Sequence, residues 1–230
     1  MGQIILEGEP PVEVALKRSS RARRLSLRVS GVDGRVTLTM PQYAREREAQ
    51  DFAREKAGWI RARLAEQAPS MLAIPGAVIP VRGVERRVEA ASVKRMELED
   101  QSLLVPATAR NQPARIGAYL KELARADLVA ASARYAAALG HPHGTITLRD
   151  TRSRWGSCSH DGRLMYSWRL ILAPAEVLDY VAAHEVAHLA EMNHSSRFWA
   201  HVGDLCPGYE APRRWLRKNG STLHRYRFRA

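Results

Sequence analysis

The run at positions 184–188, His-Glu-Val-Ala-His, has the residue types and the spacing of a metal site. It lies within Val177–Ala190, where apolar residues recur at helical spacing and predict a helix. Because four residues make about one helical turn, the imidazoles of His184 and His188 project from the same face and can bind one ion. Glu185 stands beside them, where its carboxylate can accept a proton from a metal-bound water. The pattern predicts a zinc-dependent hydrolase of the zincin type, with Glu185 as the general base.

A catalytic zinc site needs a third protein ligand and an open position for water. His194 follows ten residues after His184, the offset at which some zincins return a third imidazole after the helix. Glu191 stands where that arrangement has a glycine, so a different turn must bring His194 back. Glu191 and Glu210 remain rival third ligands, although both need a less direct path to the metal. We expect one Zn²⁺ per chain, held by His184, His188 and His194.

A longer series of motifs surrounds these histidines. It comprises RWGSCS at 154–159, Gly162, YSWRL at 166–170, Pro174, YV at 180–181, HEVAHL at 184–189, NHS at 193–195 and FW at 198–199. The series resembles the YgjP-like metallopeptidase family, which is related to the SprT-like and WLM zinc proteases. The resemblance covers roughly Thr145 to Leu216, and the N-terminal strands also resemble the accessory part of that family. It implies three histidine ligands, placed here at His184, His188 and His194, and Glu185 as the catalytic acid and base.

Residues on the N-terminal side of the helix are expected to line the cleft. Trp155, Gly156 and Ser157 predict a turn in the cleft wall, because glycine permits close backbone approach and Ser157 can donate a hydrogen bond to a substrate. Arg154 and Arg169 are candidate contacts to an anionic group, although solvated salt bridges explain them equally well.

Two further features bear on the cleft. Leu164–Leu172 is expected as a strand beside the helix, with an open edge along which an extended peptide could pair. Cys158 is not expected to bind the metal, because three histidines already fill the protein positions.

The first part of the chain is expected to be rich in strands. Alternating apolar residues within Ile4–Met40 predict an antiparallel meander, and Ala44–Gln67 predicts one long surface helix. More strands are expected within Val81–Val105. Pro106–Pro113 is polar, bounded by prolines and without periodicity, which makes it the candidate junction. We therefore expect an accessory region at 1–110.

The second part, 111–230, is expected to be the zincin-like metallohydrolase domain. A helix from Ile116 should end at Gly140, a natural C-terminal stop. A strand at Thr145–Ser153 and the Leu164–Leu172 strand should follow, and then a helix at Pro174–Glu191. Two shorter helices are expected at Ser196–Asp204 and Tyr209–Asn219. The predicted fold is α+β: a small strand-rich N-terminal part and then a mainly helical zincin-like catalytic domain.

Composition limits the classes of protein. The chain has 230 residues, 45% of them hydrophobic, which is enough for a sizeable core and excludes general disorder. No run approaches the roughly 18 apolar residues of a membrane span, and the first ten residues carry Glu7 and Glu9 where a signal peptide would be apolar. The 2 cysteines, in a chain with no predicted export signal, indicate reduced thiols. We expect a soluble cytoplasmic protein that does not bind membranes.

The net charge of +12 is concentrated in two segments. Val14–Val32 and Ala211–Ala230 are rich in arginine and lysine and contain no acidic residue. Such segments favour polyanions such as nucleic acid, because phosphate contacts release condensed counterions. A solvated basic surface explains the same charge equally simply, so charge alone names no partner.

Three functions remain open at this point. The first is hydrolysis of peptide bonds in a peptide or protein substrate by Glu185-assisted attack of a zinc-bound water. The second is hydrolysis of a nucleotide or another phosphate ester, which a basic surface would attract. The third is a nucleic-acid-binding module with a structural metal, but a structural site usually closes with four protein ligands.

Overall fold

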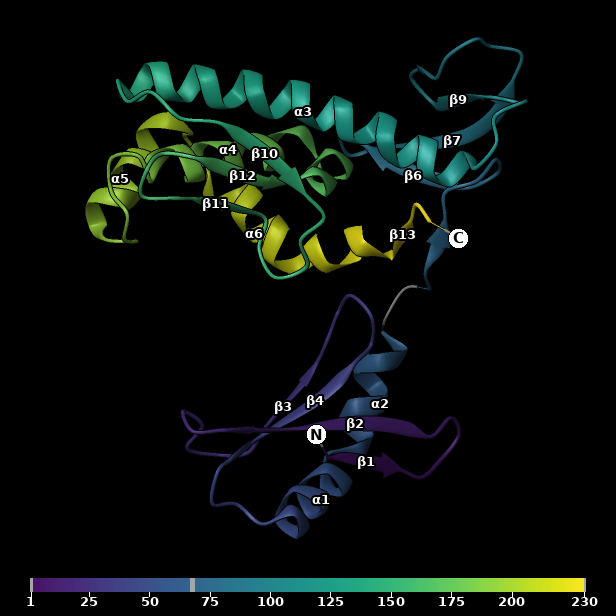
Figure 1. Cartoon of the computed structure of the whole chain (residues 1–230), viewed down its shortest axis with the longest axis vertical. Coiled ribbons are helices and arrows are strands. Elements are labelled where there is room, and N and C mark those ends of the chain that lie inside the picture. The colour runs from purple at the N-terminus through teal and green to yellow at the C-terminus, as the bar shows by residue number, and fades with distance from the viewer. Residues whose placement is uncertain (1, 67–68, 230) are drawn as a thin grey trace. The chain divides into compact units, whose positions relative to one another are not determined.

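The structure is a computed structural model that describes residues 2–66 and 69–229, and it divides into two compact units, Met1–Pro69 and Ser70–Ala230 (Figure 1). This division does not coincide with the junction expected near residue 110. The strands before Pro106 bury apolar side chains such as Val88 and Leu103 in the same core as Ile116 and Leu120 of the following helix. Residues 70–110 therefore belong to the second unit, because their strands share its hydrophobic core.

The first unit is a four-stranded sheet with two helices. Its elements are β1 (Gln3–Leu6), β2 (Val12–Ser19), β3 (Ser26–Val29), β4 (Val36–Pro41), α1 (Glu46–Glu55) and α2 (Ala57–Ala65). The strand order is β1-β2-β4-β3, and β2 and β4 are parallel, so the predicted antiparallel meander is wrong. β4 lies between β2 and β3 in the sheet, and its residues Val36, Leu38 and Met40 are buried.

The prediction of one long helix at Ala44–Gln67 is also wrong, because the described residues form two helices. The backbone leaves helical geometry at Lys56, where φ is −91° and ψ is 6°, and α2 begins at the next residue. The break lets both helices contribute to one core, through Ala49 and Ala53 of α1 and Ile60 of α2. Gln67 lies outside the described residues.

The second unit begins with strands that close around the start of the long helix. Its first elements are β5 (Met71–Leu72), β6 (Val78–Val81), β7 (Val84–Ala91), β8 (Glu97–Leu98), β9 (Ser102–Pro106) and α3 (Gln112–Leu139). The order β6-β7-β9-β8 forms a sheet, and β5 pairs with β13 (Tyr226–Arg227). The strands expected within Val81–Val105 are confirmed, and α3 ends at Gly140 as expected, with a left-handed φ of 74°.

The elements around the motif follow α3. They are β10 (Ile146–Arg149), β11 (Gly156–Cys158), β12 (Leu164–Ser167), the 3₁₀ helix η1 (Trp168–Leu172), α4 (Ala175–Ala187), α5 (Ser196–Leu205), α6 (Glu210–Asn219) and the 3₁₀ helix η2 (Gly220–Arg225). The expected strand Leu164–Leu172 stops at Ser167, because the next five residues are all buried and a helical turn buries successive residues better than a half-covered strand does. The expected helix Pro174–Glu191 ends at His188, its C-cap.

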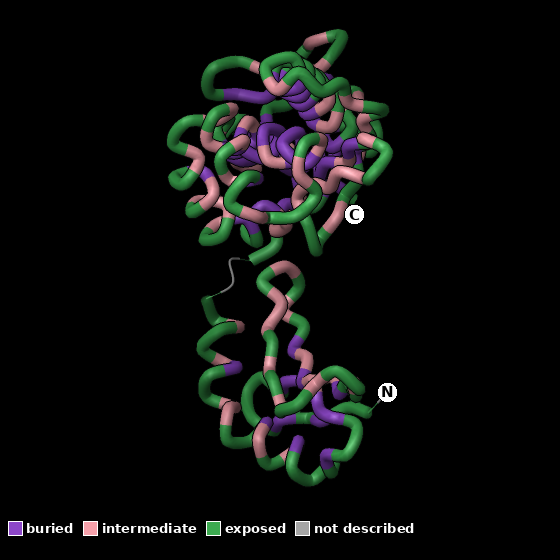
Figure 2. The backbone as a smooth tube through the Cα atoms, turned by 90° about the vertical axis from the view of Figure 1, so that its left-hand side faces the viewer, coloured by how far each residue is buried: buried purple, intermediate pink, exposed green. Residues whose placement is uncertain are grey.

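Helix α4 lies inside the second unit. It contacts α3, α5, α6, η1 and β11, and nine of its residues are buried, including Glu185. Figure 2 shows the buried backbone concentrated within each unit. Together with the strands this gives the expected mixed α+β class. Among residues 2–66 and 69–229, none of the helices combines the length and apolar character that crossing a membrane requires.

Candidate metal centre

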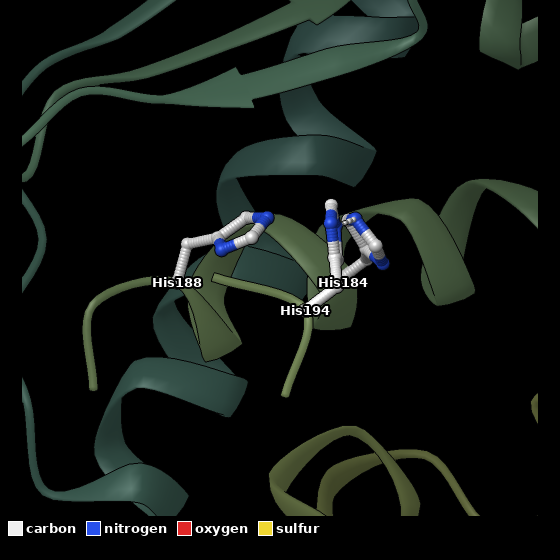
Figure 3. A group of neighbouring side chains, drawn as sticks. All are labelled: His184, His188 and His194. Carbon is white, nitrogen blue, oxygen red and sulfur yellow. Dashed lines mark hydrogen bonds between the residues drawn. The ribbon is translucent and has the colours of Figure 1, made fainter. Parts of the chain in front are cut away.

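Three histidine side chains meet at the C-terminal end of α4 (Figure 3). His184 and His188 come from this end of the helix, and His194 comes from the turn before α5. One nitrogen from each ring lies within 4.8 Å of the others. The Nε2 atoms of His184 and His194 are 3.1 Å apart. The structure therefore brings together the three residues that the sequence selected as metal ligands.

The turn after α4 returns His194 without the glycine of the longer zincin pattern. The side-chain amide of Asn193 donates a hydrogen bond of 2.6 Å to the carboxylate of Glu191, and the backbone N–H of Ser195 donates to Asn193 Oδ1. The hydroxyl of Ser195 then caps α5 by accepting from the N–H of Phe198. These side-chain hydrogen bonds stabilise the turn that, in the longer zincin pattern, contains a glycine.

The orientation of His188 is fixed by the same turn. Its Nδ1 lies 3.0 Å from the backbone carbonyl of Glu191 and donates to it, which leaves Nε2 free with a lone pair. The ring stacks on the buried Phe198, with centroids 4.4 Å apart. The carboxylate of Glu191 is used by Asn193, so Glu191 contributes to the turn through both its side chain and its backbone.

Aromatic side chains support the remaining two histidines. His184 makes edge contacts with Tyr180 and Phe198. His194 is exposed, and its ring stacks on Trp199, with centroids 5.8 Å apart. Trp199 in turn stacks on Tyr209. This packing limits how far the rings can turn away from one another.

The donor set fits a cation. Burial lowers the pKa of His184 to about 3, with further lowering from the nearby His188, His194 and Arg213, and burial also lowers the pKa of His188. Both rings are therefore neutral at pH 7, the form that binds metal. Two Nε2 atoms at 3.1 Å must share a proton unless a cation takes both lone pairs. Three imidazoles open to a cavity match a catalytic metal site better than a closed structural one.

Glu185 follows His184 in α4, and its carboxylate lies against Gly156 of β11. Its side chain is 6% exposed, and a Cβ on Gly156 would overlap its carboxylate. Burial raises the pKa of Glu185 to about 8, while the charge of Arg154 and a hydrogen bond from the backbone of Cys158 oppose that rise. A carboxylate whose pKa lies near neutrality is suited to take up and release a proton at physiological pH.

A cavity of about 440 Å³ joins the histidines to Glu185. It is lined by Ser153, Arg154, Gly156, Ser157, Cys158, His184, Glu185, His188, Met192 and His194. Met192 and Ser153 were not selected from the sequence. Met192 is an apolar residue in the polar turn between His188 and His194, and this position could have indicated that it lines the cavity. Burial raises the pKa of Cys158 to about 11, so this cysteine remains a thiol, and it is not part of the histidine group.

The edge strand beside the cavity is β11, and not the strand that the sequence indicated. The sheet order is β10-β12-β11, so β12 is central and its expected open edge is absent. Gly156 and Ser157 pair with Tyr166 and Met165 of β12 as part of β11, so the expected turn at 155–157 is largely strand. One edge of β11 is not paired with a strand among the described residues, and the strand also contacts α4.

Two of the expected cleft residues have other positions. Trp155 packs against His224 and close to Gly220, and it is not among the cavity-lining residues. Arg169 is 8% exposed; it pairs with Asp150 through two hydrogen bonds and donates to two backbone carbonyls of the C-terminal segment. Arg154 does line the cavity, as do Gly156 and Ser157.

Comparison with known proteins identifies the family of the chain. The family model described as YgjP-like, metallopeptidase domain, matches residues 23–219. The chain belongs to the YgjP-like metallopeptidase family. Its members are metal-dependent hydrolases, and the three-histidine group fits that class. The match includes most of both units of this YgjP-like chain, and it extends beyond the motifs around the histidines.

One solved structure is similar to part of this YgjP-like protein. It is the crystal structure of the metallopeptidase zymogen of Pyrococcus abyssi abylysin, with 22% sequence identity and a TM-score of 0.36. The similarity covers 40% of this chain and 93% of that chain. No curated protein matches the chain.

Proposed function

We propose that this protein is a zinc-dependent peptidase whose metal is held by His184, His188 and His194, one ion per chain, with Glu185 as the general base. The observation that carries the proposal is the shared cavity: three imidazole nitrogens and one buried carboxylate face the same space. The donors are neutral nitrogens, which zinc accepts readily, and one side of the group remains open. Family membership supports peptide hydrolysis as the reaction.

The residues of the chain have separate roles in this reaction. When bound, zinc acts as a Lewis acid that polarises a carbonyl and makes water a better nucleophile. Glu185 accepts the proton of the attacking water and passes it to the leaving amine. Because burial raises the pKa of Glu185 to about 8, both the carboxylate and the protonated carboxyl are populated near pH 7, and the same residue can take and return the proton. Gly156 leaves the space that the Glu185 carboxylate needs.

An extended peptide is the substrate that the cavity favours. β11 is an edge strand, so an extended peptide could pair by strand addition with the outer backbone groups that the Glu185 carboxylate does not use. Ser157 and Cys158 on this strand line the same cavity as Glu185. A peptide paired with β11 would thus place its main-chain carbonyls beside the histidine group.

Phosphate-ester hydrolysis receives less support from the same residues. Arg154 is the cationic side chain among those lining the cavity, whereas Arg169 is occupied by Asp150 and by two backbone carbonyls. A phosphate usually requires several donors or a helix N-terminus. The centre instead lies at the C-terminal end of α4, where the helix dipole is negative.

A structural metal in a nucleic-acid-binding module is also less well supported. Such a site closes with four protein ligands, whereas three histidines converge here and a fourth His, Cys, Asp or Glu does not join them among the described residues. A buried general base beside the ligands would have no role in a purely structural site.

The test compares wild-type protein with Glu185→Gln after zinc loading. Glutamine keeps the shape but cannot accept the proton, so we expect zinc content near one per chain in both proteins and a fall in turnover of roughly a hundredfold or more. Substrates are unfolded casein, extended fluorogenic peptides, nucleotides and p-nitrophenyl phosphate. Loss of zinc in Glu185→Gln would make Glu185 a ligand and contradict its proposed role. Faster hydrolysis of the phosphate esters than of the peptides would reject the peptidase assignment.

A further inference from the structure

One face of the sheet in the first unit is covered by helices and the other is not. Val14, Leu16 and Leu38 are buried on the covered face together with residues of α1 and α2. Alternate residues point to the opposite face, and apart from Pro41 at the end of β4 these are exposed or half-buried. Within Met1–Pro69 no described element packs on that outer face.

The outer face carries hydroxyl and basic side chains in register. Lys17 on β2 lies opposite Thr39 on β4, which lies opposite Ser26 on β3. In the adjacent row, Thr37 on β4 lies opposite Arg28 on β3. Neighbouring strands are about 4.8 Å apart, so Lys17 on β2 and Arg28 on β3 are separated by about 10 Å across the sheet, with β4 between them. Short hydroxyl side chains between them let a polymer backbone approach closely.

The loop from β2 to β3 extends this basic surface. Arg21, Arg23 and Arg24 are exposed in the loop. None of these three, nor Lys17 or Arg28, forms an ion pair with any described residue. The cluster defined by these five cations therefore has uncompensated charge. Such charge favours a polyanion through counterion release.

An exposed aromatic ring is held beside the same loop. The ring of Tyr43 is 80% exposed, although a large aromatic side chain is usually buried. Its hydroxyl donates to the backbone carbonyl of Arg23 over 3.2 Å. On either side of it, the carbonyls of Gln42 and Ala44 both accept hydrogen bonds from the guanidinium of Arg18. The ring is therefore fixed in position with a face free to stack on a base.

We infer that this surface, formed by the five cations and Tyr43, binds single-stranded nucleic acid. Uncompensated cations hold phosphates, and an aromatic ring fixed beside them provides a stacking platform for a base. An anionic membrane is a poorer partner, because Ile5 is the large apolar side chain exposed on this face and one residue offers little to insert. An acidic peptide would use the charge but has no base to stack on Tyr43.

The second basic segment lacks this combination. In α6 and the residues after it, Arg214, Arg217 and Lys218 are exposed, but Tyr226 and Phe228 are buried in the core. This segment offers charge with no exposed ring beside it among the described residues. It supplies a matched control with the same number of cations as the β2–β3 loop.

The test measures binding of full-length protein to fluorescein-labelled 20-nucleotide poly(dT) and poly(rU) by anisotropy over a range of salt. Replacing Arg21, Arg23 and Arg24 together by glutamine should weaken binding at least about tenfold and reduce the salt slope by about 2, since each phosphate contact contributes about 0.7 on single strands. The triple replacement of Arg214, Arg217 and Lys218 by glutamine should change the affinity by less than about threefold.

Two tyrosine variants separate stacking from charge. Tyr43→Ala should weaken binding at least about fivefold, whereas Tyr43→Phe keeps the ring and should stay within about twofold of the parent. Equal losses in both variants would overturn the stacking role and with it the proposal. So would undetectable binding by the parent, an equal loss from the α6 replacements, or equal affinity for polyglutamate or for phosphatidylserine vesicles. These measurements do not depend on peptidase activity.

Discussion

Gly156 and Glu185 lie so close together that a Cβ atom on Gly156 would stand under 3.0 Å from the carboxylate oxygen Oε1 of Glu185. The glycine is in the edge strand β11, and the glutamate is in the centre of the second unit on α4. The strand and the helix can therefore meet at this point because residue 156 has no side chain. The contact makes the position of the proposed general base depend on a residue that takes no part in the chemistry.

Gly156→Ala should displace Glu185 while leaving the histidines in place. The added methyl group competes with the carboxylate for space, so either the carboxylate or β11 must move. Because a small misplacement of a catalytic group is costly, we expect kcat to fall roughly a hundredfold. Zinc content should stay near one per chain, because the three atoms nearest the new methyl group all belong to Glu185 and not to a histidine. Parallel measurement of kcat and bound zinc checks both parts.

Gly58→Ala is the matched control for this substitution. Gly58 lies in α2, and apart from its chain neighbours and the backbone of its own helix no atom lies within 4 Å of the position that its Cβ would take. Alanine favours helix over glycine by about 1 kcal/mol, so thermal stability should rise slightly and activity should not change. Full activity in Gly156→Ala would show that Glu185 tolerates displacement and would contradict its role as the base.

The third ligand is decided by comparing three single variants. His194→Ala removes an imidazole that lies 3.1 Å from His184, so zinc affinity should fall at least roughly tenfold to a hundredfold. Glu191→Ala should leave affinity nearly unchanged, because His188 uses the backbone carbonyl of residue 191 and the turn keeps the hydrogen bond from Ser195 to Asn193 when the Glu191 carboxylate is lost. Glu210→Ala should also leave it nearly unchanged, since Glu210 is outside the histidine group. Competition with a chromogenic chelator measures all three. Normal affinity in His194→Ala together with loss in Glu210→Ala would reverse the assignment.

The histidine group was predictable from sequence because its geometry is local. His184 and His188 are one turn apart on a single helix, so their spacing alone places both rings on one face. His194 followed from its offset along the chain. The cleft wall was less predictable, since Arg154 and Arg169 have the same chemistry in sequence. Only the packing of the C-terminal segment onto η1 assigns Arg169 to Asp150 and leaves Arg154 in the cavity.

The fold was predictable where elements follow a local pattern and less so where pairing is distant. α3 and its stop at Gly140 follow from apolar periodicity and one glycine. The parallel pairing of β2 with β4 does not, because alternation shows that a segment is a strand and not which strand it joins. The same limit explains why the open edge predicted at Leu164–Leu172 is wrong and why β11 forms the edge instead. β11 has three residues, too few to show a period.

The charge of Arg154 should set the pH range of activity. Burial raises the pKa of Glu185, which lies at about 8 although the charge of Arg154 lowers it. A general base works as the carboxylate, so activity is present above its pKa and is lost as the pH falls through it. In Arg154→Gln the pKa of Glu185 rises, so the acid limb of the kcat/KM profile should move to higher pH. Arg154→Lys keeps the charge and should leave the limb in place. If the acid limb does not shift in Arg154→Gln, the charge of Arg154 does not affect the pKa of the catalytic base, which would contradict this prediction.

Arg169 should contribute to stability and not to catalysis. Its guanidinium binds both carboxylate oxygens of Asp150 and donates to the carbonyls of Leu223 and Tyr226. Arg169→Met removes these donors and leaves two buried carbonyls without their partner. Each unsatisfied buried group costs about 1–3 kcal/mol, so the free energy of unfolding should fall by roughly 2–4 kcal/mol. Asp150 is half-exposed and can be solvated again, which keeps the loss below that of a fully buried pair.

An exposed ion pair provides the comparison that tests this account of Arg169. Arg163 and Asp161 are 2.8 Å apart, but their side chains are 65% and 58% exposed. Arg163→Met should therefore lower the free energy of unfolding by at most about 1 kcal/mol. Urea denaturation of both variants at pH 7, with chelator present, measures the difference without a contribution from bound metal. Zinc-loaded Arg169→Met should keep its kcat at temperatures where it remains folded, because Arg169 does not line the cavity. A loss of kcat with unchanged stability would instead place Arg169 at the substrate.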